Sequence, residues 1–73
     1  MTEKIDFYQE ITIIKSTVRP EFIGRTGVVM GISEEDNILY GYTVRIQDYD
    51  YLVFFDPDDL EPTGKRFKRE DFY

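Results

Sequence analysis

Short runs rich in β-branched and aromatic residues recur along this chain, and polar or acidic turns separate them. Four such runs predict strands over residues 10–16, 27–33, 40–46 and 51–55. The clearest is the third, in which Tyr40, Tyr42, Val44 and Ile46 alternate with small or polar residues. A period of two is the signature of a strand, whereas a helical period would place Thr43 and Gln47 on the apolar stripe. No stretch supports a long amphipathic helix, so the pattern predicts an all-β fold.

The connections complete this picture. Asp-Pro-Asp-Asp-Leu at 56–60 predicts one helical turn near residues 57–60, with Asp56 as its cap and Pro57 in its first position. Residues 61–63 then read as a short closing strand, residues 20–26 as a loop and residues 1–9 as a loose lead-in. Five short strands and one turn are typical of a very small β-barrel.

Within the second strand, a period of two places Val28, Met30 and Ile32 on one face of the sheet. Gly31 then points the other way, where a missing side chain permits a bulge or a close backbone approach.

Composition limits how such a barrel is stabilised. The 73 residues make one domain, 1–73, with no Cys and no His, so disulfides and Cys/His zinc sites are excluded. Stability must come from packing, for which six Phe and six Tyr are available. Because the chain has no Cys, no visible signal sequence and no apolar run long enough to cross a bilayer, we expect a cytoplasmic protein.

Catalytic chemistry finds no support in the residues. Without Cys or His, and without a Gly-x-Ser-x-Gly turn, nucleophilic catalysis has no candidate. The acids from Asp56 to Glu61 resemble a calcium loop, but Glu61 and Phe67 stand where an EF-hand needs Gly and Glu. We therefore expect no enzyme, no cofactor and no metal site.

The charge distribution points to a binding role. The net charge is −6, and residues 34–61 hold nine carboxylates against one base, Arg45. This sign disfavours nucleic acid and favours a partner with a basic surface, which acidic turns attract by long-range steering. Tyrosines beside the acids offer contact area with little loss of rotamer freedom, and Tyr49, at a turn tip, is expected to be exposed. The candidate partner-binding residues are Glu34, Glu35, Asp36, Tyr40, Asp48, Tyr49, Asp50 and Tyr51.

The strand at residues 51–55 is apolar on both faces, which leaves two interpretations open. One face must enter the core, and the other would be exposed. In the first interpretation Phe67, Phe72 and Tyr73 of the tail fold back over it. In the second it is a partner-binding patch, since aromatic side chains are enriched at interfaces.

Four segments resemble the immunity protein 31 family of bacterial polymorphic toxin systems. They are Gly-Val-Val-Met-Gly-Ile-Ser at 27–33, Tyr-Thr-Val at 42–44, Asp-Leu-Glu-Pro-Thr-Gly-Lys at 59–65 and Lys-Arg-Glu-Asp-Phe-Tyr at 68–73. The likeness spans about residues 7–73 and is most specific after Asp59. It implies a cytoplasmic antitoxin that binds a cognate toxin domain and blocks it, without catalytic residues. The strand order is also similar to that of five-stranded SH3-like barrels.

The first hypothesis is therefore a monomeric immunity protein whose acidic hairpin ends, at one end of the barrel, dock onto a basic toxin surface. The second is a small barrel that binds nucleic acid or the ribosome through Arg19, Arg25 and the cluster at 65–69. The third is an accessory domain that regulates an enzyme by recognising a linear peptide along a tyrosine-rich groove.

Overall fold

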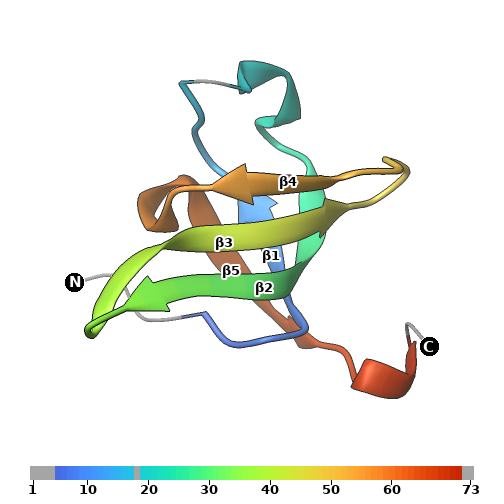
Figure 1. Ribbon diagram of the computed structural model, residues 1–73. Coiled ribbons are helices and arrows are strands. Elements are labelled where there is room, and N and C mark those ends of the chain that lie inside the picture. The colour runs from blue at the N-terminus through green and yellow to red at the C-terminus, as the bar shows by residue number, and fades with distance from the viewer. Residues whose placement is uncertain (1–4, 18, 72–73) are drawn as a thin grey trace.

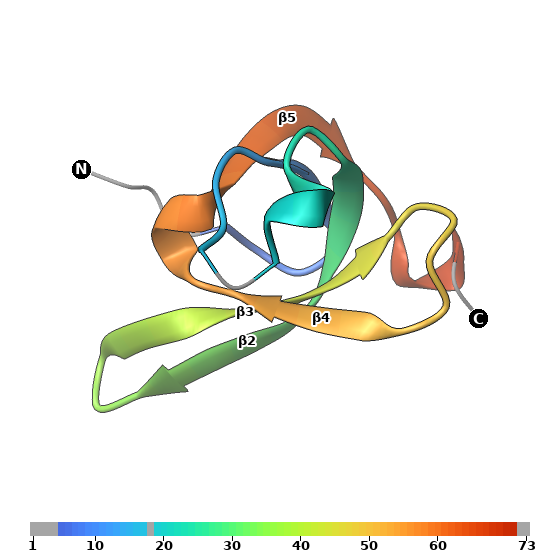
Figure 2. The same cartoon turned by 90° about the horizontal axis from the view of Figure 1, so that it is seen from above.

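Five antiparallel strands form a single curled sheet with the order β4-β3-β2-β1-β5, which confirms the predicted SH3-like all-β fold (Figures 1 and 2). The computed structural model describes residues 5–17 and 19–71. The strands are β1 (Gln9–Ile13), β2 (Thr26–Glu35), β3 (Ile38–Ile46), β4 (Leu52–Phe55) and β5 (Leu60–Arg66). Three single-turn 3-10 helices accompany them: η1 (Pro20–Phe22), η2 (Pro57–Asp59) and η3 (Arg69–Asp71).

Alternate residues of the strands supply one apolar core. The predicted alternation of β3 is confirmed for Tyr42, Val44 and Ile46, which are all buried. It is wrong for Tyr40, which is 48% exposed, because the pairing of β2 with β3 shifts register between Ser33 and Glu34. The long connection between β1 and β2 adds Phe22 of η1, which lies over the opening of the barrel (Figure 2). The buried hydrophobic residues among those described are Ile5, Ile11, Ile13, Phe22, Val29, Tyr42, Val44, Ile46, Val53, Phe55 and Leu60.

A bulge in β2 changes which of its side chains enter the core. The pairing of β2 with β3 shifts register between Val29 and Gly31, where the sequence had allowed a bulge. Val29 lies opposite Val44 in the core, and Ile32 packs against the core beside Tyr42. Val28 pairs with the exposed Arg45 on the outer face. The expectation that Val28, Met30 and Ile32 share one face is therefore wrong, because the extra residue reverses the alternation.

The described part of the lead-in is ordered by contacts with the sheet. Ile5 is buried, and its backbone N–H donates to the Tyr42 hydroxyl at 2.8 Å. The Tyr8 N–H donates to the Val29 carbonyl, also at 2.8 Å. A loose lead-in is thus wrong for residues 5–9, whereas residues 1–4 lie outside the described part. At the other end, β5 continues through Gly64, whose φ is +96°, and is longer than the expected strand at 61–63.

The turn η2 has Pro57 in its first position, as predicted, but Asp56 makes no capping side-chain bond. The Asp59 N–H instead donates to the Asp56 carbonyl at 3.0 Å. The Asp59 carbonyl accepts the Ile14 N–H at 2.8 Å, which ties η2 to the end of β1. The expected side-chain cap is therefore wrong, and backbone bonds hold this turn. No helix in residues 5–17 or 19–71 is long and apolar enough to cross a membrane.

We predict that Gly41→Ala destabilises the protein by about 1–3 kcal/mol, the usual range for overpacking. A Cβ at Gly41 would overlap both the Phe54 ring and the Phe55 carbonyl oxygen. Gly31→Ala is the matched control, because its Cβ would lie 3.2 Å from the Thr43 side chain. Urea unfolding measures both variants, and equal stability of the two would contradict this account of Gly41.

Candidate interaction surface

The two faces of β4 have different environments. Val53 and Phe55 are 7% and 2% exposed and belong to the core, whereas Leu52 and Phe54 are 56% and 52% exposed. The structure thus selects one of the two faces that the sequence left open. Other large apolar side chains are exposed elsewhere, but Leu52 and Phe54 lie on the same face of one short strand, and adjoining exposed apolar side chains mark interaction sites. This face is therefore the starting point for a site.

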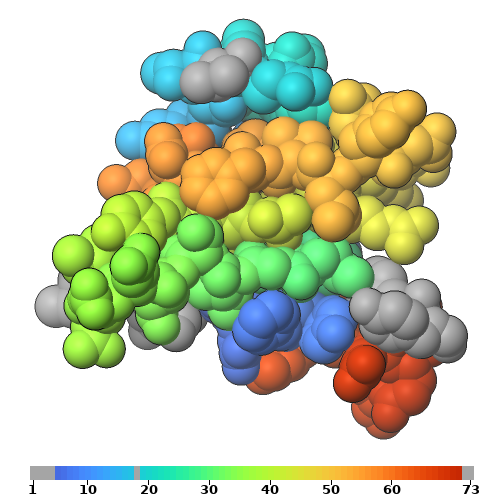
Figure 3. All heavy atoms as spheres, in the orientation of Figure 1, coloured from blue at the N-terminus to red at the C-terminus, as the bar shows by residue number. Residues whose placement is uncertain are grey.

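The described part of the tail does not cover this face. The Phe67 N–H donates to the Tyr8 carbonyl at 2.8 Å, and the Lys65 ammonium lies 4.8 Å from the Phe67 ring centroid. Figure 3 shows the tail (red) separated from β4 (orange) by β2 (green). The interpretation in which Phe67 covers β4 is therefore wrong, while Phe72 and Tyr73 lie outside the described residues.

The strand register shows what surrounds Leu52 and Phe54. Leu52 lies opposite Arg45 of β3, which in turn lies opposite Val28 of β2. Phe54 lies opposite Thr43, and its ring sits against Gly41 of β3. We call this outward surface, centred on Leu52 and Phe54, the β4 face. The residues beside Phe54 on this face, Gly41 and Thr43, are small, so the Phe54 ring projects above its neighbours.

Acidic turns border the β4 face on two sides. Glu34, Glu35 and Asp36 precede β3, whereas Asp48 and Asp50 follow it. A nine-residue strand separates the turns by roughly 25–30 Å. The expectation that both turns lie at one end of the barrel is therefore wrong. Figure 3 places β4 between the β2–β3 hairpin (green to lime) and the β3–β4 turn (gold).

The acids of η2 belong to the hairpin side of this face. The turn η2 contacts β3 and lies at the same end of the sheet as the β2–β3 hairpin in both ribbon views (Figures 1 and 2). It carries Asp58 and Asp59, and the exposed Asp56 precedes it. Negative charge is thus concentrated more strongly at the hairpin end than at the β3–β4 turn.

The four tyrosines of β3 and the following turn have different roles, and three of them, Tyr40, Tyr49 and Tyr51, were candidate contact residues. Tyr40 and Tyr51 are 48% and 73% exposed, as a contact role requires, and Tyr42 is in the core. Tyr49 is half-buried: its ring packs edge-on against Phe22 with 5.0 Å between centroids. The expected exposure of Tyr49 at a turn tip is therefore wrong, because the β1–β2 connection approaches the β3–β4 turn.

Arg19 secures this contact between the two connections. Its Nη2 donates to the Tyr49 hydroxyl at 3.2 Å, its Nε pairs with Glu21 at 3.2 Å, and its guanidinium carbon lies 5.0 Å from the Phe22 ring centroid. The hydrogen bonds with Tyr49 and then Glu21 raise the pKa of Arg19 above its ordinary value. Arg19 therefore links the β1–β2 connection to the β3–β4 turn and positions the turn that carries Asp48 and Asp50.

Several other basic side chains are also engaged within the molecule. Arg66 forms an ion pair with Asp6 at 2.8 Å, and the Arg25 Nη2 donates to the Gln47 carbonyl at 2.8 Å. Lys65 lies over the Phe67 ring, so these basic side chains are held at separate positions on the molecule. Over the described ranges, no group of three His, Cys, Asp or Glu residues could hold a metal ion.

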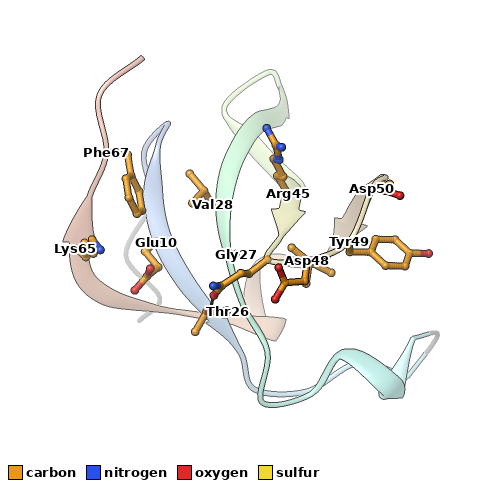
Figure 4. Close-up of a pocket in the computed structure, with 12 residues that line it drawn as sticks. Glu10, Thr26, Gly27, Val28, Arg45, Asp48, Tyr49, Asp50, Lys65 and Phe67 are labelled. Carbon is orange, nitrogen blue, oxygen red and sulfur yellow. Dashed lines mark hydrogen bonds between the residues drawn. The ribbon is translucent and has the colours of Figure 1, made fainter. Parts of the chain in front are cut away.

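A groove of about 680 Å³ separates the tail from the β3–β4 turn. Lys65 and Phe67 stand on one side, Asp48 and Tyr49 on the other, and Val28 lies between them (Figure 4). Its other charged lining residues are Glu10, Arg45 and Asp50. Because cations and carboxylates are mixed here, the groove concentrates neither sign of charge.

Leu52 and Phe54, at the centre of the candidate surface, were not among the sequence-derived binding residues. The signal for them was the apolar character of both faces of residues 51–55, which required one face to be exposed or covered. Ile38, 56% exposed beside the acidic hairpin, was also missed. Comparisons with protein-family models, curated proteins and solved structures found no match to this chain.

We predict that Phe55→Ala lowers the free energy of unfolding by about 3–5 kcal/mol, the range for a buried aromatic. Phe54→Ala should lower it by less than about 1.5 kcal/mol, because half of that side chain is already in water. Chemical denaturation of the two variants gives the comparison. Similar losses would mean that Phe54 is covered in solution.

Proposed function

We propose that this chain is an immunity protein that binds a bacterial toxin domain and neutralises it by occlusion, with the β4 face as the contact surface. The observation that supports this proposal is an exposed apolar centre, Leu52 and Phe54, which the described part of the tail does not cover and which has acidic turns on both sides. The likeness of the sequence to immunity protein 31 supplies the biological class. The proposal also makes the protein cytoplasmic and non-catalytic.

The layout of the β4 face suits a protein partner. Binding energy concentrates in a few apolar or aromatic side chains near the centre of an interface, while charged groups at the rim mainly raise the association rate. Leu52 and Phe54 occupy the central position, and Tyr40 and Tyr51 are exposed nearer the two turns. With molecular extents of 30 × 27 × 21 Å, one face can supply roughly the 800 Å² of a standard interface.

Charge complementarity suggests what kind of surface is occluded. A protein that acts on a phosphate backbone presents Lys and Arg where that backbone binds. The acidic margins of the β4 face would attract such a surface, and the apolar centre would then exclude the natural substrate. A nucleic-acid-cleaving toxin is the partner class that fits this arrangement.

Nucleic-acid binding by this chain itself has less support. Of the cations that such a role would use, Arg19 is paired with Glu21, and Arg25 is hydrogen-bonded to the backbone. In the basic segment at 65–69, Arg66 is paired with Asp6. A gel shift with generic RNA at low salt separates the two functions, and clear binding would favour the nucleic-acid role.

We predict that neutralising one acidic turn slows association with the toxin domain by about three- to tenfold at low salt and weakens its salt dependence. The change is Asp48→Asn with Asp50→Asn, since Asp48 has a φ of +66° and Asn tolerates this conformation. Glu35→Gln with Asp36→Asn should act similarly at the other margin. The two effects should multiply, because distant sites act independently.

The matched control is Glu61→Gln with Glu70→Gln, which removes the same charge from β5 and η3. Stopped-flow association at several salt concentrations gives all the rates. An equal slowing in the control would assign the effect to net charge, and an unchanged rate in both margin variants would refute the role of the acidic turns.

We predict that Phe54→Ala abolishes protection when the chain is co-expressed with the toxic domain encoded beside it, whereas the parent chain permits growth. With purified proteins, the dissociation rate should rise by about 10- to 100-fold, as for a central aromatic contact. Ile23→Ala is the control, because Ile23 is 48% exposed on the β1–β2 connection. Full protection by Phe54→Ala would place the contact elsewhere, and no protection by the parent chain would reject the function.

A further inference from the structure

The strand β4 forms one edge of the sheet. Over the described residues it pairs only with β3, so alternate residues of β4 direct backbone N–H and C=O groups away from the sheet. Edge strands in natural proteins are usually protected by charges, proline or bulges. The strand is short, which limits pairing with another chain, but Leu52, Val53, Phe54 and Phe55 include no charge and no proline, and the β3–β4 register has no bulge.

A groove of about 380 Å³ runs along this edge. All four residues of β4 line one side of it, and Ser16, Thr17 and Arg19 of the β1–β2 connection line the other. The Ser16 hydroxyl already accepts the Arg19 N–H at 2.9 Å, whereas Thr17 is exposed. The connection thus flanks the edge of β4 and leaves space beside it.

The charges that line this groove are unequal. Among the described residues, Arg19 is the one cation lining the groove, and its guanidinium pairs with Glu21 and donates to Tyr49. Asp56 and Asp59 lie where β4 ends and add negative charge to that end of the groove. An occupant with a Lys or Arg at this end would be complementary in charge.

We infer that the edge of β4 takes up an extended segment of the toxin domain as an additional strand, with a basic residue of that segment placed against Asp56 and Asp59. The inference rests on the proposed function for the source of the segment. Backbone bonds to β4 would provide affinity, and alternate side chains would provide selectivity. Apolar residues of the segment that point outward would lie beside Leu52 and Phe54, which makes the groove continuous with the β4 face.

Model peptides test the groove without the toxin. The probe is a short acetylated peptide of alternating valine and threonine with lysine at each end, and its matched control has glutamate at each end. Amide NMR spectra should shift at residues 52–55 and at Ser16 and Thr17, with binding of the lysine peptide at least about tenfold tighter. Absence of these shifts at millimolar peptide, or equal binding of both peptides, would overturn the inference.

Two further comparisons distinguish backbone pairing from non-specific binding. N-methylation of alternate peptide residues removes the N–H groups of one peptide edge, so one methylated set should lose binding and the other retain it. Thr17→Arg should obstruct the groove, whereas Thr63→Arg on β5, the opposite edge, should not. Equal effects of the two methylated sets, or of the two arginine variants, would count against strand addition.

Hydrogen exchange in the toxin complex distinguishes this inference from the proposed function. Slower exchange of the outward amides of β4 supports strand addition. If neutralisation depends on Phe54 but these amides exchange as in the free chain, strand addition is wrong and the proposed function stands. If the peptides bind and the toxin domain does not, the toxin is not the source of the segment. Protection of β4 that rises with protein concentration alone would instead identify a second copy of this chain as the occupant.

Discussion

A single small apolar core is the constraint on which this structure depends. A chain of this length buries only about 60% of the surface of its unfolded form, and it has neither disulfides nor Cys/His metal sites to compensate. Each strand that borders the core must therefore direct large side chains inward, as Ile11, Val44 and Phe55 do. Leu52 and Phe54 are large apolar side chains that remain outside this core, so the need to fill the core does not explain them.

Sequence periodicity predicted the elements well where the strands are regular. The alternation of Tyr42, Val44 and Ile46 identified the inward face of β3 correctly, because this part of the strand pairs regularly with β4 and keeps its period of two. It did not hold at Tyr40, where the β2–β3 register shifts. The period failed in β2, where the bulge before Gly31 reverses the inward face. Glycine signalled that a bulge was possible there, but only the pairing with β3 determines which residue is the extra one.

The candidate site could be predicted only in part, since its arrangement depends on contacts distant in sequence. The acidic turns were evident as composition, but their positions follow from the length of β3, which places Asp36 and Asp48 at opposite ends of one strand. Tyr49 looked exposed because its neighbours are polar, yet Phe22 and Arg19, from another connection, partly bury it. The apolar strand at residues 51–55 was recognised, whereas the choice of its outward face required the sheet register.

Gly41, which permits close packing of β3 and β4, also positions the ring of Phe54, the proposed contact residue. Because Gly41 has no side chain, the Phe54 ring can lie against the backbone of β3 while half of its surface remains in water. A ring held in this way has fewer conformations to lose when a partner covers it, which lowers the entropic penalty of binding. The hydrogen bond from Arg19 to the Tyr49 hydroxyl likewise holds the turn that carries Asp48 and Asp50. The β4 face is therefore preorganised, which favours binding with little change in backbone structure.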